Sequence, residues 1–391
     1  MPAERVNCML RSLAIAIAAI ATVGPHAAIA QEAPAAPVAA PFDSNSLKPK
    51  GRIRLLGAEV PPGTSKRLTW TGGMAMEGFV APVPVMVLNG TGPGPVLCLT
   101  AAVHGDELNG IEVVRRVLED LDVEILSGAV IGVPIVNIQG FYRGTRYLPD
   151  RRDLNRFFPG NAKGSSATRI AHSFFTEVVK HCSALVDLHT GSLNRTNLPQ
   201  VRADLRNPAA ARMTQAFGAT VVLHSKGEAG SLRRAAAAVG IPSVTFEMGE
   251  PMRVQPEQVE HGAKAVETLL YSLGMTKQRR YWGDPEPVYY ASKWVRVDNG
   301  GILFSDAALG ERVSEGELLG VVTDPITNQQ YRIYAPLSGR VLGMALNQVV
   351  LPGFAAYRIG TETKAKGIPA DTAAEDAEEA LDADDVDDET P

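Results

Sequence analysis

Residues 95–107, PVLCLTAAVHGDE, join a continuous apolar run to a short polar turn. A run of this kind is typical of a strand that is buried on both faces of a sheet. An amphipathic stretch follows as far as residue 121. The sequence therefore predicts a strand over 95–103 and a helix over 106–121, which together form the repeating unit of α/β proteins.

The same alternation continues on both sides of this stretch. Apolar runs predict further strands, at 83–89, 129–136, 184–189, 219–224 and 242–248. Amphipathic segments predict further helices, at 166–181, 207–217, 230–239 and 256–273. The pattern predicts an α/β catalytic domain over 51–283, with a mixed sheet covered by helices on both faces.

The character of the chain changes after about residue 283. Short β-rich segments such as GILF (301–304) and LLGVVT (318–323) alternate with Gly and Pro turns, which predicts a small all-β domain over 284–363. Residues 364–391 are acidic and poor in apolar side chains, so we expect a disordered tail. The Pro/Ala-rich residues 31–50 are predicted to be a linker.

The N-terminus has the pattern of an export signal. Arg5 and Arg11 precede an apolar run from Leu13 to Val23, and small residues follow at Ala28-Ile29-Ala30. The apolar run is too short to span a bilayer. We expect a signal peptide over 1–30, an exported protein (periplasmic or secreted) and no membrane span after cleavage; an uncleaved anchor is the alternative. Cys98 and Cys182 then remain, and either a disulfide or two buried thiols fits the sequence.

The formal charge of −5 is unevenly distributed. Residues 371–391 hold eleven Asp and Glu and no Lys or Arg, which leaves residues 31–370 with a formal charge of +5. A mildly basic body is compatible with an anionic substrate.

Three residues have the types and positions of metal ligands. His104 and Glu107 lie three residues apart where the predicted strand 95–103 gives way to a helix, and His189 ends the predicted strand 184–189. Any one of them alone is compatible with a capping or core polar residue. Two His and one Glu together, with a fourth position open to water, are the ligands of catalytic zinc. Asp187, on the same strand face as His189, is placed to accept a hydrogen bond from that ring.

An arginine-rich block follows the third apolar run. It contains Arg143, Arg146, Arg151, Arg152, Asn155 and Arg156. An exported chain with an enzyme-like pattern makes nucleic acid an improbable partner for this block, and a solvated basic loop is the plain alternative. Arg and Asn donors that converge on a pocket would hold a carboxylate and stabilise a developing oxyanion.

These blocks, in this order and separation, resemble the succinylglutamate desuccinylase/aspartoacylase family, within the zinc carboxypeptidase-like group, over about residues 80–275. The resemblance rests on His104-x-x-Glu107, Arg146…Asp153-Leu154-Asn155-Arg156 and Asp187-Leu188-His189-Thr190-Gly191. It implies that His104, Glu107 and His189 bind one Zn²⁺ per chain. It also implies that Asn155 and Arg156 bind a substrate carboxylate, and that Arg146 polarises the scissile carbonyl, with Arg151 and Arg152 as competitors.

A general base is still needed to move protons between water and the leaving amine. Glu247 lies in a Thr-x-Glu-x-Gly context that resembles the strand-borne catalytic Glu of this family, and Glu250 is its rival. The segment after 283 resembles the barrel-sandwich fold of lipoyl and biotinyl carriers. It has no Lys between Lys293 and Lys364, so we do not expect a swinging-arm carrier. In aspartoacylase-like enzymes a similar β domain partly covers the active site.

The leading hypothesis is a zinc-dependent amidohydrolase that removes the acyl group from an N-acyl amino acid or a related small anionic amide. An exported zinc carboxypeptidase that trims a peptide or cell-wall fragment is the second. A non-catalytic zinc-binding or ligand-binding protein is the third. The sequence leaves the acyl group, the amine and the oligomeric state undetermined.

Overall fold

The structure is a computed structural model that describes residues 51–72, 81–277 and 286–362, all within one compact unit, Ala39–Pro391. The predicted signal peptide (1–30), linker (31–50) and acidic tail (364–391) lie outside the described residues, as does the predicted boundary near residue 283. These expectations stay predictions. Within the described ranges, no helix is long and apolar enough to cross a membrane.

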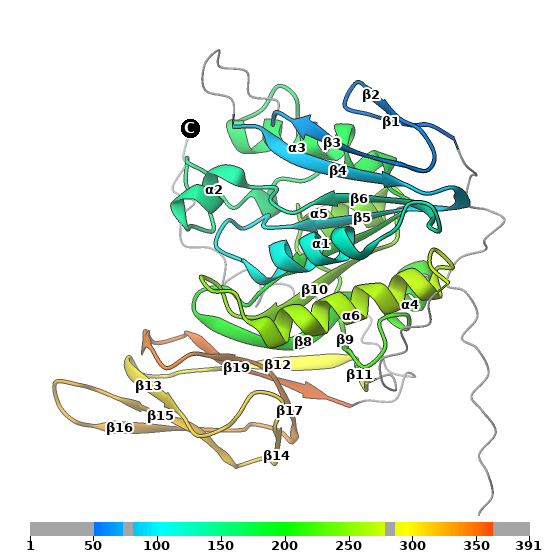
Figure 1. Cartoon of the computed structure of the whole chain (residues 1–391). Helices are drawn as coiled ribbons and strands as arrows, with labels where there is room; N and C mark the ends of the chain where they lie inside the picture. Colours follow the sequence, from blue (N-terminus) through cyan, green and yellow to red (C-terminus); the bar gives the residue numbers. More distant parts are fainter. Residues whose placement is uncertain (1–50, 73–80, 278–285, 363–391) are drawn as a thin grey trace, which may run out of the picture. The chain divides into compact units, whose positions relative to one another are not determined.

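A mixed sheet is the centre of the fold (Figure 1). Its N-terminal strands are β3 (Thr64–Trp70), β4 (Val83–Asn89), β5 (Gly92–Ala101), β6 (Ser127–Val133), β7 (Ala184–His189), β8 (Arg195–Ala203), β9 (Val221–His224) and β10 (Ser243–Gly249). The neighbours β6, β5, β7 and β10 pair in parallel, whereas β3, β4 and β8 join the sheet antiparallel. The short strands β1 (Ile53–Leu55) and β2 (Ala58–Val60) form a separate hairpin.

Helices cover both faces of this sheet. One face carries α1 (Asn109–Asp120), α4 (Pro208–Thr214) and α6 (Pro256–Ser272), and the other carries α3 (Ser166–Glu177) and α5 (Leu232–Ala238). Successive side chains of β5 point to opposite faces, so Leu97 and Leu99 pack with the first group of helices and Cys98 with the second. The described residues also include three shorter helices: α2 (Ile138–Arg143), η1 (Leu154–Arg156) and η2 (Val179–His181).

The predicted mixed sheet with helices on both faces is confirmed, with differences in detail. Helix α1 begins at Asn109, three residues after the predicted start, and α3 ends at Glu177, where a short 3₁₀ turn takes over. Strand β8 was not predicted, because its sequence RTNLPQVRA has neither an apolar run nor a clean alternation. It is nevertheless almost wholly buried, because β10 and β17 flank it.

The C-terminal region is all-β, as predicted, but it does not stand apart. Its strands are β11 (Val288–Tyr289), β12 (Ala291–Arg296), β13 (Gly301–Ser305), β14 (Arg312–Val313), β15 (Leu318–Thr323), β16 (Gln330–Tyr334), β17 (Gly339–Ala345), β18 (Val349–Val350) and β19 (Ala355–Thr361). Four of these strands, β16-β15-β13-β18, form their own sheet. Strand β17 pairs with β8, so the main sheet continues through β19 to β12.

Cys98 and Cys182 form a disulfide with their Cα atoms 5.7 Å apart. Cys98 lies on β5, and Cys182 immediately precedes the parallel neighbour β7. The bridge therefore joins the second half of β5 to the segment just before β7, and the C-terminal ends of these two strands lead to the predicted metal ligands His104 and His189.

Candidate active site

His104 and Glu107 lie in the loop between β5 and α1, whereas the predicted helix over 106–121 would place Glu107 in its first turn. The loop is held by a turn from Glu107 N–H to the carbonyl of His104 (3.2 Å) and by a hydrogen bond from Met252 N–H to the carbonyl of Asp106 (2.8 Å). Gly105 packs so closely that a Cβ atom on it would lie 2.1 Å from the carbonyl carbon of Gly140. This loop turns both side chains toward the end of β7.

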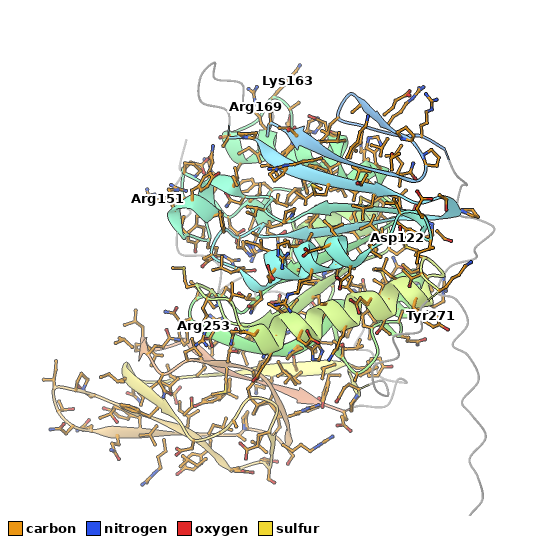
Figure 2. The ribbon with its side chains drawn as sticks, viewed as in Figure 1. Asp122, Arg151, Lys163, Arg169, Arg253 and Tyr271 are labelled. Atoms are coloured by element: carbon orange, nitrogen blue, oxygen red, sulfur yellow. A yellow bond between two sulfur atoms is a disulfide. The ribbon has the colours of Figure 1, made fainter. Side chains whose placement is uncertain are left out.

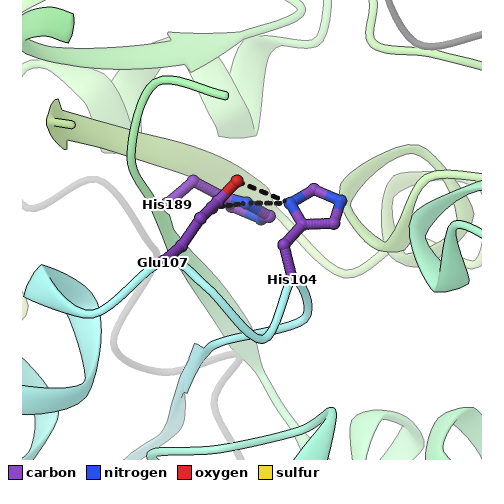
Figure 3. Close-up of side chains that lie close together, drawn as sticks. All are labelled: His104, Glu107 and His189. Carbon is purple, nitrogen blue, oxygen red and sulfur yellow. Dashed lines mark hydrogen bonds and ion pairs between the residues drawn. The ribbon is translucent and has the colours of Figure 1, made fainter. Parts of the chain in front are cut away.

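His189, the last residue of β7, completes a buried triad with these two residues (Figure 3). Nδ1 of His104 lies 2.8 Å from Oε1 of Glu107, and Nδ1 of His189 lies 2.8 Å from Oε2 of the same carboxylate. The two Nδ1 atoms are 3.2 Å apart. The three ligand atoms therefore surround one point, at spacings that suit a single metal ion.

The outer ring nitrogens show why a cation fits this point. Nε2 of His104 is 3.1 Å from Asp153, and Nε2 of His189 is 2.8 Å from Asp187. A carboxylate accepts hydrogen bonds, so with a metal ion bound each Nε2 would carry the ring proton and each Nδ1 would present its lone pair to the metal. Two lone pairs and a carboxylate then face each other, an arrangement that a metal ion stabilises. The predicted hydrogen bond from the His189 ring to Asp187 is confirmed.

The close approach of these ionisable side chains also shifts their pKa values. Burial opposes the charged form of His189, but the carboxylates of Asp187 and Glu107 raise its pKa well above the usual value. Burial would raise the pKa of Glu107, but His104 and His189 lower it below its usual value. Burial also opposes the charge of Asp153, yet Arg146 holds its pKa well below the usual range. A metal ion supplies the positive charge that protons provide in its absence.

A polar cavity of about 110 Å³ opens beside the triad. It is lined by all seven residues predicted for the site: His104, Glu107, Arg146, Asn155, Arg156, His189 and Glu247. Glu247 lies near the end of β10, as the register partner of His189 on β7. Its rival Glu250 does not line the cavity and instead pairs with Arg253 at 3.1 Å.

Arg146 reaches the cavity, whereas its two competitors do not. Its guanidinium donates from Nη1 to Glu107 (3.2 Å) and from Nη2 to Asp153 (2.7 Å). Arg151 is exposed on the outside of the molecule (Figure 2), and Arg152 pairs with Asp150. Only Arg146 among the three can therefore contact a bound substrate, and it also braces two carboxylates around the triad.

Asn155 and Arg156 lie together on η1 and face the cavity with hydrogen-bond donors. Oδ1 of Asn155 accepts from the backbone N–H of Leu232 at 2.8 Å, which leaves its amide NH₂ to donate to a ligand. Nε of Arg156 is buried and has no hydrogen-bond partner among the described residues. Both side chains are suited to an oxyanion or carboxylate.

Further cavity residues were missed by the sequence reasoning. Asn197 and Arg202 of β8 contact Glu247, and Trp294 comes from β12 of the C-terminal β region. Asp153, which was noticed only as part of a motif, contacts both His104 and Arg146. For Asn197 and Arg202 the signal is weak, because polar residues within β8 would have been informative only if that segment had been recognised as a buried strand.

A buried His-Glu-His triad beside an open polar cavity, at the ends of parallel strands, defines a metal-dependent hydrolase of the catalytic-zinc type. Residues 93–273 match the succinylglutamate desuccinylase/aspartoacylase catalytic domain, so this part of the chain has the catalytic domain of that family. It is therefore a deacylase, an enzyme that hydrolyses amide bonds. The predicted family and enzyme class are confirmed.

Characterised relatives agree with this assignment. The chain is 28% identical over 254 residues to N-alpha-acetyl-L-2,4-diaminobutyric acid deacetylase of Halomonas elongata, a match that covers 62% of this chain and 74% of that protein. It is similar to the crystal structure of succinylglutamate desuccinylase/aspartoacylase from Rhodobacter sphaeroides, with a TM-score of 0.66 and 25% identity over 73% of this chain and 90% of that one. The fold is shared with the product-bound ectoine utilization protein EutE (DoeB) from Ruegeria pomeroyi, with a TM-score of 0.69 and 23% identity over 80% of this chain and 99% of that one.

Proposed function

We propose that this protein is an exported enzyme that binds one Zn²⁺ and removes the acyl group from a small N-acyl amino acid with a free carboxylate. One observation carries the proposal. The metal triad, a carboxylate suited to proton transfer and a pair of carboxylate-binding donors all line the same small cavity. The similarity to a deacetylase of an N-acetylated amino acid supports this substrate class.

The charge of the cavity supports an anionic substrate. Five arginines line it, against three glutamates, one of which is a metal ligand. A bound divalent cation would add further positive charge. Such a surface attracts a carboxylate-bearing molecule and favours its binding.

Each cavity residue has a role in the proposed reaction. When bound, zinc supplies Lewis acidity to the attacking water and to the scissile carbonyl. Glu247 takes the proton from the water and delivers it to the leaving amine nitrogen. Arg146 stabilises the negative charge that develops on the carbonyl oxygen. Asn155 and Arg156 hold the free carboxylate of the substrate and so orient the amide.

Two observations support export. The N-terminal sequence has the pattern of a cleaved signal, and Cys98 and Cys182 form a disulfide. Structural disulfides persist in oxidising compartments such as the periplasm.

A substrate panel tests the proposed activity. Zinc-loaded protein is incubated with N-acetyl and N-succinyl amino acids, their methyl esters and short peptides, and the released amine is measured. We expect hydrolysis of N-acyl amino acids. The methyl esters should be hydrolysed at least about tenfold more slowly, because Asn155 and Arg156 then have no carboxylate to bind. Release of C-terminal residues from peptides, with no turnover of N-acyl amino acids, would instead establish the carboxypeptidase alternative.

A further inference from the structure

Strand β8 links the catalytic part of the sheet to the C-terminal β region, and Asn197 lies at the junction. On one side β8 pairs with β10, where Asn197 is opposite Gly249. On the other side it pairs with β17, where Asn197 is opposite Gly343. The position of a residue here depends on the C-terminal strands and in turn affects the active site.

The side chain of Asn197 holds the carboxylate of Glu247. Its Nδ2 donates a hydrogen bond to Oε2 of Glu247 at 3.0 Å, and Oε1 of the same carboxylate lies 3.4 Å from Nη1 of Arg202. All three side chains are buried and line the cavity. Both oxygens of Glu247 thus have a partner on β8, which fixes the plane of the carboxylate relative to the metal triad.

The C-terminal β region in turn holds Asn197. Gly343 of β17 has no side chain, and a Cβ atom on it would lie 2.6 Å from Oδ1 of Asn197. The amide therefore occupies space that only glycine leaves. Arg195, two residues earlier on β8, lies 5.1 Å from the ring centre of Trp294 and 5.0 Å from that of Phe354, both in the C-terminal β region. These contacts anchor the same segment of β8 a second time.

We propose that Asn197 is the positioning residue for Glu247. The C-terminal β region is then part of the catalytic machinery, because Gly343 leaves the space that the Asn197 amide occupies. The inference rests on the proposed function, in which Glu247 carries the proton. A carboxylate that serves first the water and then the leaving nitrogen must be held in one orientation, because small displacements of a proton-transfer group cost rate. The β region then does more than cover the cavity.

Asn197→Asp tests the first link, because Asp has nearly the same shape but, when ionised, cannot donate to a carboxylate. We expect kcat to fall about tenfold or more, with KM close to wild type and zinc retained. In a Glu247→Gln background the same change should alter kcat less than about twofold, because the group that it positions is gone. A raised KM with normal kcat would overturn the proposal, since Asn197 would then bind substrate.

Gly343→Ala tests the second link without replacing any residue that lines the cavity. Its Cβ should displace the flexible Asn197 amide and lower kcat in the same sense, and it should have little further effect in the Asn197→Asp background. Gly300→Ala is the matched control, because its nearest new contact is Pro352 at 3.2 Å. Gly343→Ala also tests the proposed role of Asn197 if the Asn197→Asp variant fails to fold. Normal kcat in Gly343→Ala would show that the β region does not position the site.

Different outcomes would overturn the proposed role of Glu247 and the proposed role of Asn197. Normal turnover by Glu247→Gln alone would overturn the proposed role of Glu247. A large loss in Glu247→Gln, combined with normal turnover in folded Asn197→Asp, would leave the proposed function standing and remove only the inference about Asn197.

Discussion

Glu247 on β10 lies directly opposite His189 on β7 in a parallel pairing, so the proposed proton carrier and a metal ligand are register neighbours. Side chains at paired positions of adjacent parallel strands point to the same side of a sheet. On the other side of β10, Asn197 and Arg202 of β8 contact the Glu247 carboxylate. The order β8-β10-β7 thus places the metal ligand, the carboxylate and its partners in a row.

Removal of a ring ligand should abolish zinc binding. We expect His104→Ala and His189→Ala to lose nearly all of the one zinc per chain, because each contributes one of three protein ligands at a buried site. His181→Ala is the control, since this histidine is exposed on η2. Metal analysis of the purified variants provides the measurement, and full retention in both ligand variants would show that the triad is misassigned.

Arg146 and Arg156, two of the arginines that line the cavity, should have separable kinetic effects. Arg156→Lys should mainly raise KM, because a lysine cannot reproduce the two parallel N–H donors that a guanidinium offers to a carboxylate. Arg146→Ala should mainly lower kcat, by about 10²–10³-fold if it acts as other oxyanion donors do. Arg151→Ala, at an exposed position outside the cavity, should leave both constants near wild type. If wild-type enzyme hydrolyses methyl esters as fast as free acids, the assignment of Asn155 and Arg156 as carboxylate-binding residues is wrong.

The disulfide should contribute substantially to stability. Cys98 and Cys182 are 84 residues apart in sequence, and closing a loop of that size lowers the entropy of the unfolded chain by an amount worth about 4 kcal/mol. We expect the Cys98→Ala/Cys182→Ala double variant, and wild type kept in reductant, to unfold at clearly lower urea concentration than oxidised wild type. Equal midpoints would show that the bridge does not form or does not constrain the chain.

Half-buried His261 should make stability fall in mild acid. Burial, and then the charge of Lys264, lower the pKa of this histidine from 6.5 to about 4. The neutral ring is therefore favoured in the folded state, so its stabilising effect is complete above pH 6.5 and is lost as the pH falls toward 4. Between pH 7 and 4 wild type should lose about 2–3 kcal/mol more than His261→Gln does, as measured by urea unfolding. Parallel pH curves for the two proteins would refute this.

The sequence predicted the site better than it predicted the sheet around it. His104, Glu107 and His189 are identifiable because each follows an apolar strand that an α/β pattern makes visible. Strand β8 is invisible to the same reasoning, since three of its buried side chains, Arg195, Asn197 and Arg202, are polar and line the cavity. Without β8, neither Asn197 nor the continuity of the sheet into β17 could be foreseen.

The arginine block shows the same limit. Five arginines within 143–156 are alike in sequence, and only the chain path decides that Arg146 and Arg156 enter the cavity while Arg151 lies outside. The two cysteines were equally undetermined, because pairing depends on the register of β5 against β7.

Reconstitution of metal-free protein tests the central claim, that one zinc ion in the His104–Glu107–His189 triad supports amide hydrolysis. Protein stripped with a chelator is titrated with Zn²⁺, and the release of free amino acid from an N-acetyl amino acid that the wild type hydrolyses is measured at each step. We predict negligible turnover without metal and a linear rise that ends at one equivalent of zinc per chain, with His189→Ala inactive throughout. Turnover by the stripped protein equal to that of the zinc-loaded protein would contradict the claim.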